Sequence, residues 1–297
     1  MRGPERGFLL LTGTLGIPER KPLTLSQLRI LSSRVKQSDV QGLDRELMAE
    51  DLVALGYGED MAKHIVMLLS DEAILDRYLQ RGKKAGCVPI SRVSDAYPDM
   101  LRQRLGLESP GCLWIKGNTE ILSMPRISLV GSRDILPLNR DFAWEVGLQA
   151  AKQGYTLVSG NARGADKTAQ TACLNNGGYV ISVVADELSD KIPDEHILYI
   201  SENDFNQSFS AQRAISRNRV IHALGEKTFV AQCGYQTGGT WDGTVKNLSH
   251  GWSPVFCMND GSRASDELQQ MGAVGISANE LQCIEQLRPA SISFLDT

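Results

Sequence analysis

The clearest structural signal in the chain is a pair of segments, Ile127-Ser-Leu-Val-Gly-Ser-Arg133 and Tyr155-Thr-Leu-Val-Ser-Gly-Asn-Ala-Arg-Gly-Ala-Asp166. In each segment an apolar, strand-like run breaks at a glycine, and an arginine follows before helix-forming sequence begins. A strand–turn–helix unit aims free backbone N–H groups and the positive end of the helix dipole at the space above the sheet edge. Because a guanidinium can hold two phosphate oxygens at once, the arginines favour a phosphate as the anion.

Either turn alone is typical of any α/β protein, since glycine lets a strand turn tightly and a helix pack close to the sheet. Two such turns together indicate a nucleotide or a nucleic-acid backbone as the ligand. In the first turn, Gly131 removes a Cβ that would block a ligand, Ser132 offers a hydroxyl and Arg133 carries a fixed positive charge. The second turn supplies Ser159, Gly160, Arg163 and Gly164, and then Asp166, which we expect to orient Arg163 or Arg133.

From Val88 onward, apolar runs alternate with helical spacing, which predicts a Rossmann-like α/β fold: a mostly parallel sheet with helices on both faces. Leu138, Phe142, Val146 and Ala150 recur every fourth residue and predict a buried helix face that ends at Gly154. Strands are predicted near 127–131, 155–160, 179–185, 228–232 and 254–258, with a shorter one near 198–201. Further helices are predicted over 165–175, 209–224, 240–248, 264–271 and 278–287.

Residues 1–85 are predicted to form a small all-helical domain ahead of a Rossmann-like domain over 86–297. Its helices are predicted over 23–36, 44–55, 59–70 and 72–82. The apolar run Phe8 to Ile17 follows two arginines but is short and contains glycine and threonine, so we interpret it as the structured start of this domain. Leu55-Gly-Tyr-Gly58 is similar to the turn of a helix-hairpin-helix module, although a glycine turn between two packed helices explains it more simply.

The overall composition limits how the chain can bind nucleic acid. The chain has 297 residues, 42% of them hydrophobic and 22% charged, with a formal net charge of −4. A protein that coats nucleic acid through bulk charge normally has a basic surplus, so any such site must be a local pocket. The six cysteines form no C-x-x-C pair, which predicts reduced thiols in a cytoplasmic protein without a metal site. No apolar run is long enough to span a membrane.

Several separated motifs occur in one order along residues 86 to 258. They are Tyr97-Pro98, Leu113-Trp-Ile-Lys-Gly117, the two arginine turns, Gly177-Gly178 and Arg217-Asn-Arg-Val-Ile221. In this order they resemble the DNA-processing protein A family, also called DprA or Smf. The resemblance implies a Rossmann-like domain that binds single-stranded DNA without strong sequence preference and loads a RecA-type recombinase during DNA uptake, in natural transformation. It further implies a homodimer, no catalysis and no cofactor.

The resemblance extends the candidate phosphate- or nucleotide-binding residues beyond the two turns. Arg217, Asn218 and Arg219 match the family's Arg-Asn-Arg segment, although Arg213 and Arg217, four residues apart, would otherwise indicate a solvated helix face. Asp190-Lys-Ile-Pro193 looks like a shortened family segment that lacks its tyrosine, and Lys191 is its candidate. Gly238, Gly239 and Thr240 are predicted to form an anion-receiving helix start.

Two departures from the family pattern leave other functions open. The segment Gly234 to Thr244 lacks the usual acidic residue and serine-glycine entry, and we expect no C-terminal winged-helix domain after the helix predicted over 278–287. One alternative is a signalling protein that senses a small nucleotide in the same pocket. Another is a nucleotide phosphoribohydrolase, whose signature Thr237 to Thr244 echoes without its proline and catalytic glutamate. No catalytic constellation is recognisable in the chain, so we expect no enzyme.

Overall fold

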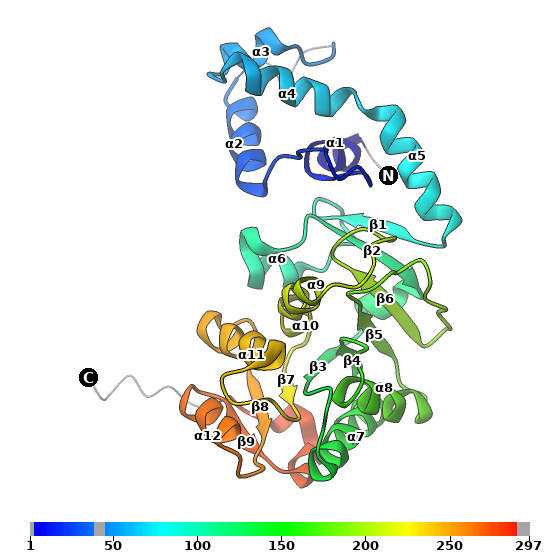
Figure 1. Cartoon of the computed structure of the whole chain (residues 1–297), viewed down its shortest axis with the longest axis vertical. Helices are drawn as coiled ribbons and strands as arrows, with labels where there is room; N and C mark the ends of the chain where they lie inside the picture. The colour runs from blue at the N-terminus through cyan, green and yellow to red at the C-terminus, as the bar shows by residue number, and fades with distance from the viewer. Residues whose placement is uncertain (1–2, 39–44, 290–297) are drawn as a thin grey trace, which may run out of the picture. The chain divides into compact units, whose positions relative to one another are not determined.

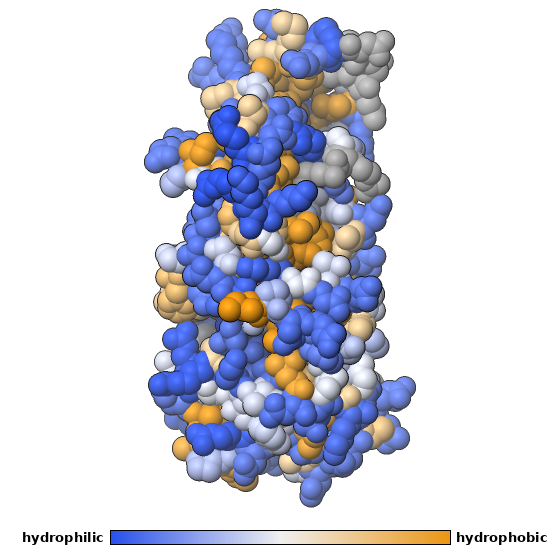
Figure 2. All heavy atoms as spheres, turned by 90° about the vertical axis from the view of Figure 1, so that its right-hand side faces the viewer, coloured by the Kyte–Doolittle hydropathy of each residue, from blue (hydrophilic) through white to orange (hydrophobic). Residues whose placement is uncertain are grey.

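The computed structural model describes residues 3–38 and 45–289. The chain forms two compact units (Figure 1), the first made of Met1–Tyr97 with Pro110–Leu113 and the second of Pro98–Ser109 with Trp114–Thr297. The sequence places its domain boundary between residues 85 and 86, and this division stays a prediction. The face drawn in Figure 2 is mostly hydrophilic, with apolar residues in small separate groups.

The first unit is mostly helical and has its own core. Its helices are α1 (Gly3–Thr12), α2 (Leu25–Lys36), α3 (Ala49–Ala54), α4 (Glu59–Ser70) and α5 (Glu72–Lys84). Its core includes Leu11, Leu31, Leu52, Ile65 and Leu68. The four predicted helices are present, although the prediction over 44–55 begins on a residue outside the described range. The first half of the apolar run that follows the first arginines lies in α1, whose Phe8 to Leu11 are buried.

The sheet has nine strands in the order β1-β2-β6-β5-β4-β3-β7-β8-β9. All neighbours from β6 to β9 pair in parallel, and β2 pairs with β6 antiparallel. The predicted Rossmann-like α/β class is therefore confirmed, as are the six predicted strands. The strands are β1 (Val88–Ser91), β2 (Cys112–Gly117), β3 (Arg126–Val130), β4 (Thr156–Ser159), β5 (Val180–Val183), β6 (Ile197–Ser201), β7 (Thr228–Val230), β8 (Val255–Met258) and β9 (Val274–Ile276). Sequence reasoning did not predict β1, β2 or β9.

Helices cover both faces of the sheet. They are α6 (Asp99–Leu105), α7 (Pro137–Lys152), α8 (Ala165–Asn175), α9 (Ala211–Ser216), α10 (Asn218–Leu224), α11 (Gly238–His250) and α12 (Arg263–Gln270), with 3-10 turns at η2 (Gly106–Glu108), η3 (Thr119–Ser123) and η4 (Ala278–Gln286). Successive side chains of a strand point to opposite faces. Ile127 and Leu129 pack in one core with Phe142 of α7. Between them, Ser128 donates a hydrogen bond to the Ile221 carbonyl of α10 on the other face.

Three predicted helices differ from the structure. Leu138 is 60% exposed because it lies in the first turn of α7, ahead of the buried face formed by Phe142, Val146 and Ala150. The helix predicted over 209–224 is broken at Arg217, which separates α9 from α10. The helix predicted over 278–287 is a 3-10 segment with a kink at Cys283.

The strand order creates a crevice at one edge of the sheet. From β3 the chain moves outward through β4, β5 and β6 on one side, and then returns to β7 on the other side of β3. In parallel sheets, ligands bind beyond the carboxyl ends of the strands at the point where the strand order reverses. This point lies at the ends of β3 and β7, and the two arginine turns follow β3 and β4.

Candidate anion-binding site

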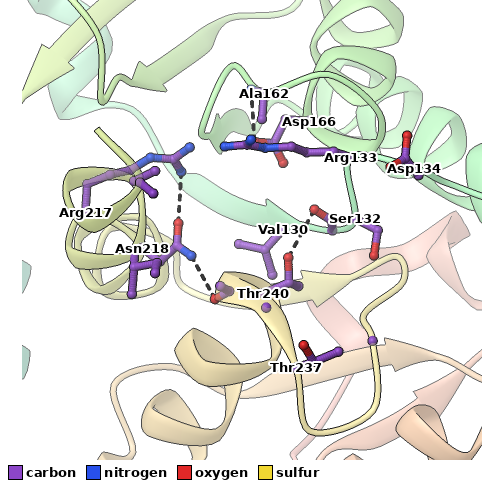
Figure 3. Close-up of a pocket in the computed structure, with 17 residues that line it drawn as sticks. Val130, Ser132, Arg133, Asp134, Ala162, Asp166, Arg217, Asn218, Thr237 and Thr240 are labelled. Carbon is purple, nitrogen blue, oxygen red and sulfur yellow. Dashed lines mark hydrogen bonds between the residues drawn. The ribbon is translucent and has the colours of Figure 1, made fainter. Parts of the chain in front are cut away.

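A cavity of about 490 Å³ lies where the strand order reverses (Figure 3). Its walls come from the end of β3, the turn after β4, the break between α9 and α10, and the start of α11. We call it the central cavity. Nine of the predicted site residues line it: Gly131, Ser132, Arg133, Asp166, Arg217, Asn218, Gly238, Gly239 and Thr240.

The two arginine turns pack directly against each other. The Ala165 amide donates to the Ser132 carbonyl at 3.1 Å, and Gly164 has a φ of +85°, which favours glycine. A Cβ on Gly164 would lie 2.4 Å from that carbonyl oxygen, and a Cβ on Gly131 would lie 2.4 Å from the Cβ of Ala165. The space that Gly131 leaves is therefore filled by α8, which brings the start of this helix to the cavity wall.

Asp166 stabilises the backbone of the second turn by hydrogen bonds. Its buried Oδ2 accepts hydrogen bonds from the backbone amides of Gly160 at 3.1 Å and Ala162 at 3.2 Å. Burial raises the pKa of Asp166, while the charge of Arg217 and the two amides act in the opposite direction. The carboxyl group thus holds the turn backbone, and of the two arginines that it was expected to orient, the charge of Arg133 acts on it. Arg163 instead pairs with Asp134 at 2.6 Å on the exposed surface.

Arg217 is a cation held inside the protein, only 6% exposed. Its Nη2 donates to the Gly160 carbonyl at 2.9 Å and its Nη1 to Asn218 Oδ1 at 3.1 Å, while its buried Nε has no acceptor among the described residues. Gly160 makes room for it, because a Cβ there would lie 1.9 Å from Nη1. Burial lowers the pKa of Arg217, and the nearby charge of Arg133 acts in the same direction.

Arg133 approaches the same space from the opposite side of the central cavity, and Figure 3 shows the two guanidinium groups pointing toward one another. The Arg133 side chain is exposed and forms no hydrogen bond or ion pair with the part of the chain that the structure describes. Its guanidinium lies 5.6 Å from the centre of the Phe209 ring. The two arginine charges face one buried carboxylate, Asp166, because the other carboxylate of the lining, Asp134, is paired with Arg163. The excess of positive charge favours binding of an anion.

The floor of the central cavity is fixed by hydrogen bonds between strand ends and helix starts. Thr240 Oγ1 donates to the Gly131 carbonyl at 3.1 Å, and Asn218 Nδ2 donates to the Gly239 carbonyl at 2.9 Å. The Ser132 amide donates to the Gln232 carbonyl at 2.9 Å. Helix α11 begins at Gly238, and the first N–H groups of a helix have no partners within it. These groups add to the positive potential of the cavity.

Two further cavities adjoin the central one and share Arg133 with it. A groove of about 870 Å³ is lined by Arg133, Arg163 and Gly164 together with residues of α7 and α8, and we call it the α7–α8 groove. A smaller cavity of about 300 Å³ is lined by Arg133, Gly160, Arg163 and Phe209. Arg133 therefore stands at the junction of the three cavities.

The remaining predicted residues lie outside these cavities. Ser159 is buried, and its Oγ accepts a hydrogen bond from Gln170 Nε2 at 2.6 Å. Lys191 pairs with Asp186, and Arg219 pairs with the buried carboxylate of Glu202 at 2.7 Å. Arg213 binds Asn203 Oδ1 and the carbonyls of the preceding loop, so it fastens that loop and does not form a solvated face with Arg217.

Two exposed aromatic residues that share a cavity with Arg133 were missed by sequence reasoning. Phe209 was placed in a helix but precedes α9 and is 53% exposed. Trp144 of α7 is 41% exposed and lines the α7–α8 groove. The helical spacing predicts that Trp144 is exposed. It lies two residues from both Phe142 and Val146, which is about 200° of helical rotation, so its side chain points away from the buried face. No comparable signal marks Phe209.

Among residues 3–38 and 45–289, no group of three or more histidine, cysteine, aspartate or glutamate side chains is placed to hold a metal ion. No helix in that same range is both long and apolar enough to cross a membrane.

Comparisons with known proteins identify relatives of the whole α/β region. The family model described as DNA recombination-mediator protein A matches residues 89–281. DNA processing protein DprA of Streptococcus pneumoniae is 26% identical over 210 residues, which cover 67% of this chain and 71% of that protein. DNA processing protein DprA of Bacillus subtilis is 28% identical over 171 residues, which cover 54% of this chain and only 55% of that protein.

Solved structures show the same fold. The X-ray structure of DNA processing protein A from Streptococcus pneumoniae superposes with a TM-score of 0.73 at 22% identity, covering 97% of this chain and 100% of that one. DNA processing protein A from Helicobacter pylori, solved to describe its single-stranded DNA binding mode, has a TM-score of 0.55 at 21% identity. That match covers 66% of this chain and 94% of the other.

Proposed function

Because this chain belongs to the DNA recombination-mediator protein A family, we propose that it binds single-stranded DNA and acts in DNA processing and recombination. The proposed site is the central cavity with the turns after β3 and β4. The relative from Helicobacter pylori, which has a single-stranded DNA binding mode, supports this choice of ligand. The proposed role is binding, with no bond made or broken by this chain.

The observation that carries the proposal is the exposed guanidinium of Arg133. It has no hydrogen-bond or ion-pair partner among the described residues, and it stands where three cavities meet, opposite the buried cation Arg217. A phosphate between the two groups would relieve their mutual repulsion and accept hydrogen bonds from Arg133. Backbone contacts of this kind carry no sequence information, which suits a protein that binds strands of any sequence.

Phe209 supplies the aromatic partner that such a site needs. Its exposed ring packs against Arg133, beside the cavity of about 300 Å³. Proteins that bind single strands combine phosphate contacts with aromatic rings on which unpaired bases stack. We propose that a base next to the bound phosphate stacks on Phe209, so that duplex DNA, whose bases are already paired, binds more weakly.

Several finer parts of the role follow from the family and are proposed with it. They are loading of a RecA-type recombinase onto the bound strand, a homodimeric assembly, action during DNA uptake, and a cytoplasmic location. A separate helical domain over residues 1–85 is also proposed. Its turn at Gly56 joins α3 to α4, as expected for two packed helices.

Fluorescence anisotropy with a labelled single-stranded oligonucleotide, across a salt series, tests the proposal. We expect Arg133→Ala to weaken binding to all sequences by about 1.5–3 kcal/mol, the usual size of a hydrogen bond to a charged group. The slope of log affinity against log salt should also fall by about 0.7, the value for one phosphate contact on a single strand.

Lys152→Ala is the matched control, because Lys152 is an exposed cation at the opposite end of α7, beside the amino ends of the strands. It should leave affinity and salt slope unchanged. If Arg133→Ala and Lys152→Ala behave alike, or if the wild-type protein binds no oligonucleotide at low salt, the proposal fails.

A small nucleotide is the second candidate ligand. The central cavity of about 490 Å³ has the size of ordinary small-molecule sites, and the buried Nε of Arg217 lacks an acceptor among the described residues. Without DNA binding, a rise in melting temperature with a mononucleotide, lost in Arg217→Met, would favour this reading.

A further inference from the structure

The α7–α8 groove has the composition of a nucleic-acid surface. Four cations line it, Arg133, Arg140, Arg163 and Lys167, and its single carboxylate, Asp134, is paired with Arg163. The chain as a whole carries a formal net charge of −4, so the positive charge of this groove is opposite in sign to the net charge of the protein. A concentrated basic surface on an acidic protein favours a local polyanion site.

The lining residues of each helix lie on the helix face that borders the groove. Arg140 and Trp144 are four residues apart on α7, and Lys167 and Thr171 are four apart on α8, so each pair lies on one helix face. The opposite faces of both helices are buried in the core under the sheet, as Phe142 and Ala169 illustrate. Both helices therefore turn a polar, partly cationic face into one groove.

Trp144 is the exposed aromatic residue of this groove, which it lines together with the exposed Leu136. It is 41% exposed, whereas Trp114, Trp241 and Trp252 are 3%, 6% and 4% exposed. An exposed indole in a groove lined by cations matches the way that proteins hold single strands, with phosphates on basic groups and bases on aromatic rings. A duplex would offer the phosphates without an unstacked base.

The α7–α8 groove is continuous with the proposed DNA site. Arg133 lines both the groove and the central cavity, and Asp134 does so as well. A strand whose phosphate is held at Arg133 has the groove as its neighbouring space, with Arg140 and Lys167 placed for the next phosphates and Trp144 for a base.

We propose that bound single-stranded DNA continues from Arg133 into the α7–α8 groove, where Trp144 stacks on a base and Arg140 and Lys167 contact phosphates. This inference rests on the proposed function, because it takes Arg133 as the point from which the strand continues. The binding site then includes both the central cavity and the α7–α8 groove. A longer strand contacts more of this site, so affinity for single-stranded DNA should rise with strand length.

Intrinsic tryptophan fluorescence tests the path, because Trp144 is the exposed tryptophan among the four. Long oligothymidylate should quench the emission of the wild-type protein, and Trp144→Phe should abolish the quenching while anisotropy still reports binding. Trp144→Ala should weaken binding of the long strand by about fivefold to a hundredfold, the equivalent of one base–aromatic stack. Lys167→Ala should weaken it too, whereas Lys152→Ala should not.

The outcomes separate the two proposals. If the long strand binds and Arg133→Ala weakens it, but there is no quenching and Trp144→Ala binds as well as wild type, the groove is not on the path although the central site stands. If a duplex of the same length quenches equally, base stacking on Trp144 is wrong. If the wild-type protein binds no single strand, both proposals fall. Melting temperatures of each variant exclude misfolding as the cause of a loss.

Discussion

At the scale of single residues, the site depends on charged groups that are buried and held by backbone atoms. Asp166 accepts from two amides of the second turn, and Arg217 donates to the Gly160 carbonyl of the same turn. A buried ion is stable only when hydrogen bonds replace its water. The turn that carries Arg163 is thereby fixed before any ligand arrives, and a preorganised site loses less conformational entropy on binding.

His222 makes the free energy of unfolding depend on pH, and the buried position of its ring sets the sign of that dependence. The ring is fully buried, its Nδ1 accepts from Asn247 Nδ2 at 3.1 Å, and burial lowers its pKa to about 3. The unfolded chain has a histidine pKa of about 6.5. Below that value the unfolded state binds a proton that the folded state does not, so the stabilising contribution of His222 is complete above pH 6.5 and is lost as pH falls toward 3.

We therefore expect the wild-type free energy of unfolding to fall more steeply between pH 6 and pH 4 than that of His222→Gln. The difference in slope should approach about 1.4 kcal/mol per pH unit, the effect of one proton. Urea unfolding at a series of pH values measures it. Comparing the two proteins at about pH 7.5, above the range in which histidine titrates, separates any packing loss in His222→Gln from the difference in slope. Parallel pH profiles for wild type and His222→Gln would contradict the assignment.

At the scale of elements, the approach of α8 to β3 is set by one pair of small residues. The Cβ of an alanine at position 131 would lie 2.4 Å from the Cβ of Ala165, closer than two carbons can approach. We expect Gly131→Ala to push α8 away from the sheet and to destabilise the protein by about 1–3 kcal/mol, as in overpacked cores. Oligonucleotide affinity should fall with it, because Ser132 and Arg133 follow directly.

The second-site variant Ala165→Gly tests this explanation. It removes the opposing Cβ, so the double variant should regain most of the stability lost by Gly131→Ala. A remaining deficit of less than about 1 kcal/mol is expected, because Ala165 is the first residue of α8 and glycine costs about 1 kcal/mol in a helix interior. Thermal unfolding and anisotropy of the three variants measure both effects. A double variant that is less stable than Gly131→Ala would show that contact with Ala165 is not the cause.

The same elements show which parts of the site a sequence can predict. Strand runs that end in Gly131 and Gly160 are local patterns, and both turns were located correctly from them. The burial and the contacts of a side chain depend on residues that are distant in the sequence, so a local pattern does not predict them. Arg217 follows helical spacing that normally indicates a solvated face, and its burial depends on a missing Cβ at Gly160, 57 residues away. Lys191 and Arg219 were proposed as ligand contacts, and their pairing with Asp186 and Glu202 depends on tertiary packing.

At the scale of the whole molecule, the described residues include two hydrophobic cores that are separate from each other. One joins α7, α8 and η4 to the central strands, and the other joins helices α1 to α4 of the first unit. Separate cores allow separate unfolding transitions. The four tryptophans all lie in the second unit, so their fluorescence reports on that unit alone, whereas circular dichroism reports on the helices of both.

We expect denaturant unfolding to give different midpoints by fluorescence and by far-ultraviolet circular dichroism. Leu68→Ala, in the fully buried core of the first unit, should shift only the dichroism curve, and Leu129→Ala, equally buried in β3, should shift the fluorescence curve, each by about 2–5 kcal/mol.

An oligonucleotide at a hundred times its Kd should stabilise the fluorescence transition by about 2.7 kcal/mol, because it binds the folded second unit. If both probes give one midpoint and each variant shifts both curves equally, the two units unfold as one, and the predicted domain division has no thermodynamic counterpart.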